Sequence, residues 1–206
     1  MFSMNFSRTL RLSLLALMLA GAAGFAAADT YHVDIDTSAY AGTGYLDLSF
    51  LGYADSDAAT ATVSNFSGAL GSYVELSDDV SGTLGHVATF GNSGGYNDLF
   101  QAVTLGGVFS FDVSFSGSFL TGSSSSDTTF AVSLLNDTQT AYLGADQSLV
   151  MFDLVSGQGV TPTSYSAIAS VSAVPEPSAW LLMAGGLVLV VVAARRRNAT
   201  SLPLAV

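Results

Sequence analysis

The middle of the chain alternates apolar and polar residues, and this period of two most constrains how it can fold. The clearest run is 108–117, in which phenylalanines and valine alternate with serines and an aspartate. Successive side chains of a β-strand point to opposite faces, so such a run buries one face and exposes the other. The run therefore predicts a half-buried antiparallel strand with Phe109, Phe111 and Phe115 buried together.

Similar runs recur along the chain between clusters of Gly, Ser, Asn and Asp. They lie near residues 31–36, 45–50, 60–66, 72–76, 86–90, 99–105, 129–135, 148–155 and 165–171. No stretch of this middle part shows a helical period with capping residues at its ends. Nine or ten short strands with turn signals between them are typical of an all-β fold, and we expect an antiparallel, jelly-roll-like β-sandwich.

The charge of this middle part is one-sided. The chain has 16 acidic residues and five basic ones, and all the basic residues are arginines near its two ends. Residues 29–174 therefore carry no basic side chain except His32 and His86. Such a surface repels phosphate backbones, so nucleic acid is excluded as a partner. Each carboxylate must be solvated, hydrogen-bonded or neutralised by a cation, and the absence of cysteine excludes disulfides and thiolate metal sites.

Residues 1–28 have the pattern of a secretory signal peptide. Its parts are a positive start with Arg8 and Arg11, an apolar run over 12–20, and the small residues Ala26-Ala27-Ala28. We expect signal peptidase to read Ala26 and Ala28 and to leave Asp29 as the mature N-terminus. The alternative is an uncleaved signal anchor, although the apolar run is short for a membrane span.

Residues 173–197 carry the most specific motif of the chain. Its parts follow one another as Pro175-Glu176-Pro177, Trp180, an apolar run to residue 194, and Arg195-Arg196-Arg197. About sixteen apolar residues would make a helix of roughly 24 Å, a thin but workable membrane crossing. Trp180 would lie at the outer interface and the arginines in the cytoplasm, followed by the short tail 198–206. The alternative is a plain anchor preceded by a chance turn.

This order of Pro-Glu-Pro, span and arginine cluster resembles the PEP-CTERM sorting signal of Gram-negative bacteria. The resemblance implies recognition by an exosortase, with a cut near Pro-Glu-Pro. It also implies export to the cell surface or extracellular matrix, in species that build exopolysaccharide and biofilm. The ectodomain, residues 29–172, is similar to an uncharacterised β-rich domain of some PEP-CTERM proteins, for which the resemblance implies no activity. The residues that carry this second likeness are 31–38, 61–66, 97–101 and 110–117.

Candidate catalytic chemistry is sparse. An enzyme needs a nucleophile, a base and an orienting group, and neither histidine lies in a nucleophile elbow or in a paired metal spacing. Glu75 and scattered aspartates make a weak case for the two carboxylates of a glycosidase. We therefore predict no catalytic residue and a non-enzymatic structural or binding protein. The alternative is a hydrolase that acts on matrix polysaccharide.

Two kinds of ligand have candidate residues. The acidic pairs Asp34 and Asp36, Asp55 and Asp57, and Asp78 and Asp79 offer the oxygen ligands that Ca²⁺ prefers, but solvated strand edges explain them equally well, and no cofactor is required. Exopolysaccharide is the candidate partner of the ectodomain, by analogy with the expected fold and setting. The candidate stacking residues, which flank glycine-rich turns, are Tyr40, Tyr45, Tyr53 and Tyr96.

Overall fold

The computed structural model of the chain describes residues 30–175 and 185–186. Residues 30–174 lie in one compact unit. The predicted signal peptide lies outside the described residues, as does the predicted span except for Gly185 and Gly186, which are helical. Within the described ranges, no helix is long and apolar enough to cross a membrane.

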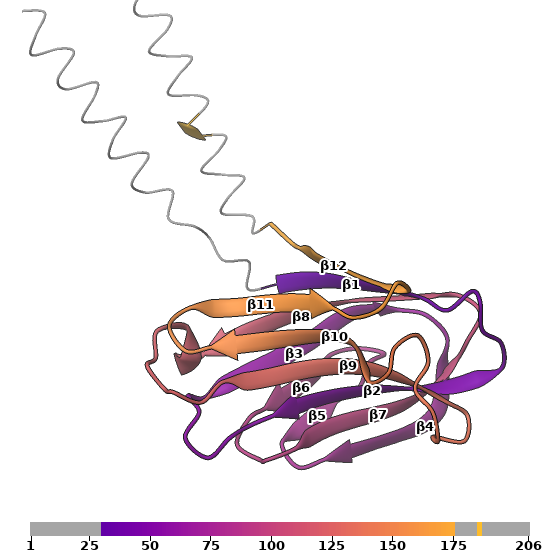
Figure 1. The fold of residues 1–206 in the computed structure, drawn as a ribbon, viewed down its shortest axis with the longest axis horizontal. Coiled ribbons are helices and arrows are strands. Elements are labelled where there is room, and N and C mark those ends of the chain that lie inside the picture. Colours follow the sequence, from indigo (N-terminus) through magenta and orange to yellow (C-terminus); the bar gives the residue numbers. More distant parts are fainter. Residues whose placement is uncertain (1–29, 176–184, 187–206) are drawn as a thin grey trace, which may run out of the picture. The chain divides into compact units, whose positions relative to one another are not determined.

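The compact unit consists of two antiparallel sheets of six strands each (Figure 1). Sheet A has the strand order β12 (Ala169–Ala173), β1 (Thr30–Asp36), β8 (Val108–Gly117), β3 (Ala59–Ser67), β6 (Ala88–Gly91) and β5 (Val80–Gly82). Sheet B has the order β11 (Gly159–Ser164), β10 (Ser148–Val155), β9 (Thr128–Asn136), β2 (Thr43–Leu51), β7 (Asn97–Thr104) and β4 (Leu70–Ser77). The predicted β-sandwich is confirmed.

The first eight strands are arranged as in a jelly roll. They pair in nested order, β1 with β8, β2 with β7 and β3 with β6, as though one long hairpin were wrapped into two sheets. The short β5 departs from this order, because it pairs with β6 at the edge of sheet A. Strands β9, β10 and β11 extend sheet B beyond β2, and β12 then returns to pair with β1.

The predicted runs correspond to observed strands, with two corrections. Strands β5 and β11 are not among the predicted runs, and the run predicted near 165–171 begins too early: only residues from Ala169 onward form a strand, β12, which follows a crossing from sheet B to sheet A. Strand β11 contains Pro162, which lowers the strand signal of its sequence. Proline has no N–H to donate, but an edge strand tolerates this, and β11 is the edge of sheet B.

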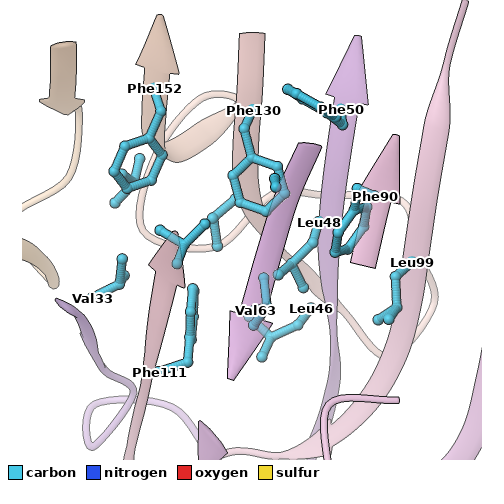
Figure 2. Packing of buried hydrophobic residues seen from close by; sticks show 14 of the residues in the cluster. Val33, Leu46, Leu48, Phe50, Val63, Phe90, Leu99, Phe111, Phe130 and Phe152 are labelled. Carbon is cyan, nitrogen blue, oxygen red and sulfur yellow. The ribbon is translucent and has the colours of Figure 1, made fainter. Parts of the chain in front are cut away.

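The core lies between the two sheets and is rich in phenylalanine. Phe109, Phe111 and Phe115 are at most 2% exposed, which confirms the predicted inner face of β8. In Figure 2, side chains from both sheets meet in this layer. Most of its aromatic pairs are edge-to-face or tilted; Phe130 and Phe90, for example, are T-shaped with their centroids 5.3 Å apart. The apolar residues of both sheets thus form one core.

The turn between β3 and β4 shows how local sequence fits this packing. Asn65 has a φ of 54° in the irregular end of β3, where the register with β8 shifts. Gly68 follows with a φ of 140°, and a Cβ atom there would lie 2.3 Å from the ring of Phe109. Asparagine and glycine tolerate positive φ better than other residues, so this sequence permits a tight turn over the core.

Candidate functional site: the outer face of sheet B

The exposed tyrosines of the ectodomain gather along sheet B. Tyr73 lies in β4, Tyr96 precedes β7, Tyr142 is bridged to Leu135 of β9, and Tyr165 follows β11. These four tyrosines are between 45% and 58% exposed. We use the name tyrosine face for them together with the outward side chains of sheet B, which include Tyr45, Asp47, Ser49, Glu75, Asp98, Phe100, Ser133, Ser148 and Met151.

Three aromatic rings form one end of the tyrosine face. Tyr45 is stacked on Phe100 of the neighbouring strand, with ring centroids 4.7 Å apart and an angle of 13° between the planes. Tyr73 meets Tyr45 edge-on, with centroids 6.0 Å apart. The hydroxyl of Tyr73 also donates a hydrogen bond of 2.6 Å to Oε2 of Glu75, which raises the pKa of the phenol. These contacts hold the rings in fixed orientations on a sheet surface.

Two carboxyl groups lie at the centre of the face. Asp47 is opposite Phe100, and Asp98 is opposite Ser49 on the same two strands. Burial and then the negative charge of Asp98 raise the pKa of Asp47 to about 6. Burial also raises the pKa of Asp98. One carboxyl oxygen of each group is buried, and neither oxygen has a hydrogen-bond partner among the described residues.

Tyr96 lies beside these carboxyl groups. Burial raises the pKa of its phenol to about 12, with further contributions from the negative charges of Asp47 and Asp98. The carboxyl groups therefore lie near an aromatic ring, and no cationic side chain within residues 30–175 offsets their charge. A polar, partly desolvated acidic patch of this kind is a candidate binding surface.

A hollow of about 520 Å³ lies at the other end of the face. It is lined by Ala145, Asp146, Gln147, Ser148, Met151 and Tyr165. A row of outward residues across neighbouring strands connects Asp47 with the hollow. Asp47 is opposite Ser133, and Ser133 is opposite Ser148, which lines the hollow. The hydroxyl oxygens of these two serines are 3.4 Å apart. The tyrosine face thus continues from the aromatic rings on β4 to a concave end beside β10.

The candidate sugar-stacking residues lie in different environments. Tyr45 and Tyr96 belong to the tyrosine face, whereas Tyr53 is 58% exposed in the loop after β2. Tyr40 packs partly buried against the core. Sequence reasoning missed Tyr73, Tyr142 and Tyr165, and it did not join Asp47 to Asp98. The alternation within β2 and β7 places both aspartates outward, but only the pairing of these strands makes them neighbours.

His32 belongs to a different cluster, on the outer face of sheet A. Its Nδ1 lies 2.6 Å from Oδ1 of Asp112, and its Nε2 lies 3.4 Å from Oδ1 of Asp34. Asn65 donates a second hydrogen bond, of 2.7 Å, to Asp112. The bond to Asp112 is the main cause of the raised pKa of His32. Because both ring nitrogens face carboxylates, this arrangement does not place a serine against His32 as a nucleophile would require.

Several of the candidate calcium ligands have partners within the protein. Asp36 accepts the N–H of Ser38 at 2.9 Å, and Asp57 accepts the N–H of Ser124 at 3.0 Å. The side chain of Asp79 accepts a short hydrogen bond from Ser93. In residues 30–175, no three His, Asp or Glu side chains are grouped so that they could hold a metal ion. Calcium binding stays a prediction.

The compact unit ends at Val174, directly before Pro175, the first of the predicted sorting residues. The N–H of Val174 donates to the carbonyl of Thr30 at 2.9 Å, so strand pairing reaches the residue before Pro175. Pro175 is exposed. The other predicted residues of both processing signals lie outside the described part of the chain: Ala26, Ala28, Asp29, Glu176, Pro177, Trp180, Arg195, Arg196 and Arg197.

Comparison with known proteins identifies the C-terminal segment, and no match covers the β-sandwich. No curated protein and no solved structure shows significant similarity to the chain. Residues 173–197 match the family model described as the PEP-CTERM protein-sorting motif. This match covers the same residues as the motif predicted from the sequence, and it implies export and sorting by an exosortase. The chain therefore carries a PEP-CTERM sorting motif, directly after a β-sandwich.

Proposed function

We propose that this protein is an exported, non-enzymatic binding protein of the cell surface or extracellular matrix, and that its tyrosine face binds polysaccharide. The observation that carries this proposal is the gathering of exposed tyrosines beside carboxyl groups and a hollow on one face of one sheet. Tyrosine has an apolar ring and a polar hydroxyl, which suits surfaces that must bind and still remain wet. Binding sites of this kind combine apolar walls with a few polar groups.

The chemistry of a sugar fits such a face. One side of a sugar ring presents C–H groups that can pack on an aromatic ring, while its hydroxyls point outward as hydrogen-bond donors. Carboxylate oxygens accept such donors strongly, because charge-assisted hydrogen bonds exceed neutral ones in strength. Asp146 lies in the hollow with Gln147 and Ser148, within the same set of walls as the ring of Tyr165.

The alternative function is a hydrolase that acts on the same polymer. The observation in its favour is the raised pKa of Asp47, because a general acid must hold its proton near neutral pH. Glycosidases use two carboxyl groups on either side of the scissile bond, and Asp98 would be the second. Against this, the burial of one oxygen of each group limits access by substrate.

One experiment separates the two functions. The full-length chain, purified in a mild detergent, is incubated with exopolysaccharide from the producing cell. Binding predicts that protein is retained on the polymer and that no new reducing ends are formed. Hydrolysis predicts release of oligosaccharides, which Asp47→Asn should abolish. If the wild-type protein neither binds nor cleaves any matrix polysaccharide, the proposed function is wrong.

The route to the surface has its own test. We propose that the protein passes through the inner membrane with its sandwich outside, and that processing near Pro175-Glu176-Pro177 then releases it. Replacement of these three residues by alanine should leave export intact and trap the full-length form in the membrane fraction. The size and fraction of the protein are compared in the two strains by immunoblot. Equal size and equal membrane retention would mean that the segment is an ordinary anchor.

A further inference from the structure

We propose that the hollow beside Tyr165 is a sugar subsite of the tyrosine face and that it takes an uncharged glycan. This inference rests on the proposed polysaccharide binding and names both its place and its ligand class. The hollow is formed by residues from the end of the loop before β10, from β10 itself and from the position directly after β11. It is therefore built by segments that the pairing of sheet B holds together.

The walls of the hollow suit a sugar better than a purely apolar or an ionic ligand. Tyr165 is 58% exposed, and Met151 is an outward residue of β10 that adds apolar surface. Asp146, Gln147 and Ser148 supply acceptors and donors within the same walls. A volume of about 520 Å³ lies in the range of small-ligand sites, roughly 300–1,000 Å³.

Hydrogen bonds of the backbone hold Tyr165 in place beside β10. Its N–H donates to the carbonyl of Leu149 at 2.9 Å, which ties the residue to β10. Nearby, the hydroxyl of Ser166 donates to the carbonyl of Gly144 at 2.6 Å, which ties the same crossing to the loop before β10. The two sides of the hollow are thus joined by hydrogen bonds, so binding requires little ordering of the backbone.

The charge of the face decides the class of glycan. Asp146 lies in the hollow, and Asp47, Asp98 and Glu75 lie along the face that leads away from it. Residues 30–174 contain neither Arg nor Lys to neutralise an anionic ligand. His32 is on the outer face of sheet A, engaged by two carboxylates. A polymer of uronic acids or phosphates would meet like charge at every step, whereas an uncharged glycan would not.

The test measures the retention of the full-length chain in mild detergent on gels that contain polysaccharide. The probes are neutral polysaccharides (β-glucan, α-glucan, mannan and galactan) and two polyuronates (alginate and pectate), each at about 10 mM and 150 mM salt. We expect retention by at least one neutral polymer with little effect of salt. We expect no retention by polyuronates at low salt, where charge repulsion reaches about 30 Å.

Variants locate the subsite. Tyr165→Ala should weaken binding of the neutral polymer about tenfold or more, as loss of a central aromatic residue does at other binding sites. Tyr165→Phe, which keeps the ring, should stay within about threefold of the wild type. Tyr53→Ala is the matched control, because Tyr53 is also 58% exposed but lies outside the hollow. Asp146→Asn should keep neutral binding, because the amide still offers a hydrogen-bond donor and acceptor within the hollow.

The outcomes distinguish this inference from the proposed function. If the wild-type chain binds no polysaccharide, the proposed function fails and the inference fails with it. If it binds a neutral polymer but Tyr165→Ala and Tyr53→Ala behave alike, the function stands and the subsite is wrong. If polyuronates bind at low salt as well as neutral polymers do, the ligand class is wrong. Equal unfolding temperatures of the two alanine variants show that lost binding does not reflect lost folding.

Discussion

The outer faces of the two sheets differ sharply, although their inner faces are alike. Apart from Val108 at the start of β8, the outward residues of β1, β8 and β3 in sheet A are mostly polar or charged: His32, Asp34, Thr60, Thr62, Ser64, Ser110, Asp112, Ser114 and Ser116. The outer face of sheet B instead carries stacked rings and partly buried carboxyl groups. Hydroxyl-rich faces are easily solvated, whereas clustered rings expose apolar surface to water. The comparison therefore supports the proposal that the outer face of sheet B is the binding face.

The carboxyl groups of the two faces make the same contrast. Asp112 on sheet A is bonded to Asn65 and His32, and these bonds outweigh the effect of burial and keep its pKa below its usual value. Asp47 on sheet B has a buried oxygen without a partner, and its pKa is raised to about 6. An unpaired buried charge costs stability. Sheet A thus uses its carboxylates to hold the fold, and sheet B carries carboxylates that weaken it.

The largest expected effect tests whether the two inner faces are equivalent. Phe111 of sheet A and Phe152 of sheet B are both fully buried. Replacement of either by alanine should reduce the free energy of unfolding by about 3–5 kcal/mol, because each change leaves a cavity in the same core. Chemical denaturation measures both. The outward Ser110→Ala should change stability by less than about 0.5 kcal/mol; a loss under about 1 kcal/mol for either phenylalanine would contradict the shared core.

The second prediction concerns pH. The folded-state pKa of Asp47 is raised from 3.8 to about 6, so the folded state binds a proton that the unfolded state releases between these values. Stability should therefore rise as pH falls from about 7 to about 4, by up to roughly 3 kcal/mol from this group. The raised pKa values of Asp98 and His32 act in the same direction. Below about pH 4 stability should fall, because the lowered pKa of Asp57 acts oppositely.

This pH profile is measured by urea denaturation at a series of pH values. Asp47→Asn is the control, since it removes the group that dominates the predicted slope between pH 4 and 7. If the wild-type protein is most stable near pH 7 and loses stability steadily towards pH 4, the unpaired state of Asp47 is wrong.

A smaller effect is expected when the same substitution, aspartate to asparagine, is made on the outer face of each sheet. Asp47→Asn should stabilise the protein at pH 7 by about 1–2 kcal/mol, because it removes a buried, unpaired charge. Asp112→Asn should destabilise it by about 0.5–1 kcal/mol, because it weakens a half-exposed pair with His32. Thermal unfolding of the two variants at equal pH checks the opposite signs. If the unfolding temperatures of both variants shift in the same direction, the inferred electrostatic difference between the two faces is wrong.

The smallest effect is expected on the hydroxyl-rich face. Ser116 of β8 is exposed and lies opposite Thr60 on β3. Ser116→Ala should change stability by less than about 0.5 kcal/mol and leave polysaccharide retention unchanged. Retention on gels that contain the bound polymer gives the readout. A clear loss of binding would show that sheet A also contacts the ligand, and the contrast between the faces would then not locate the site.

The sequence by itself determined the sandwich and the sorting motif, because both are written in local order. Alternation in 108–117 assigns each residue to a face without knowledge of its neighbours. The order of Pro-Glu-Pro, apolar run and arginines is likewise read along the chain, and the family match covers the same residues. The alternation pattern does not predict a strand whose composition is unusual for a strand. Strand β11 contains Pro162 and is stable because it is an edge strand.

Only the tertiary structure decided which residues act together. Asp47 and Asp98 are far apart in the chain and become neighbours because β2 pairs with β7 in one register. Tyr165 and Asp146 share a hollow because the chain crosses from β11 towards sheet A past the loop before β10. Alternation states that a side chain points outward, but not from which sheet or beside which strand. A shift of one residue would reverse every face, so the site depends on the register that long-range pairing fixes.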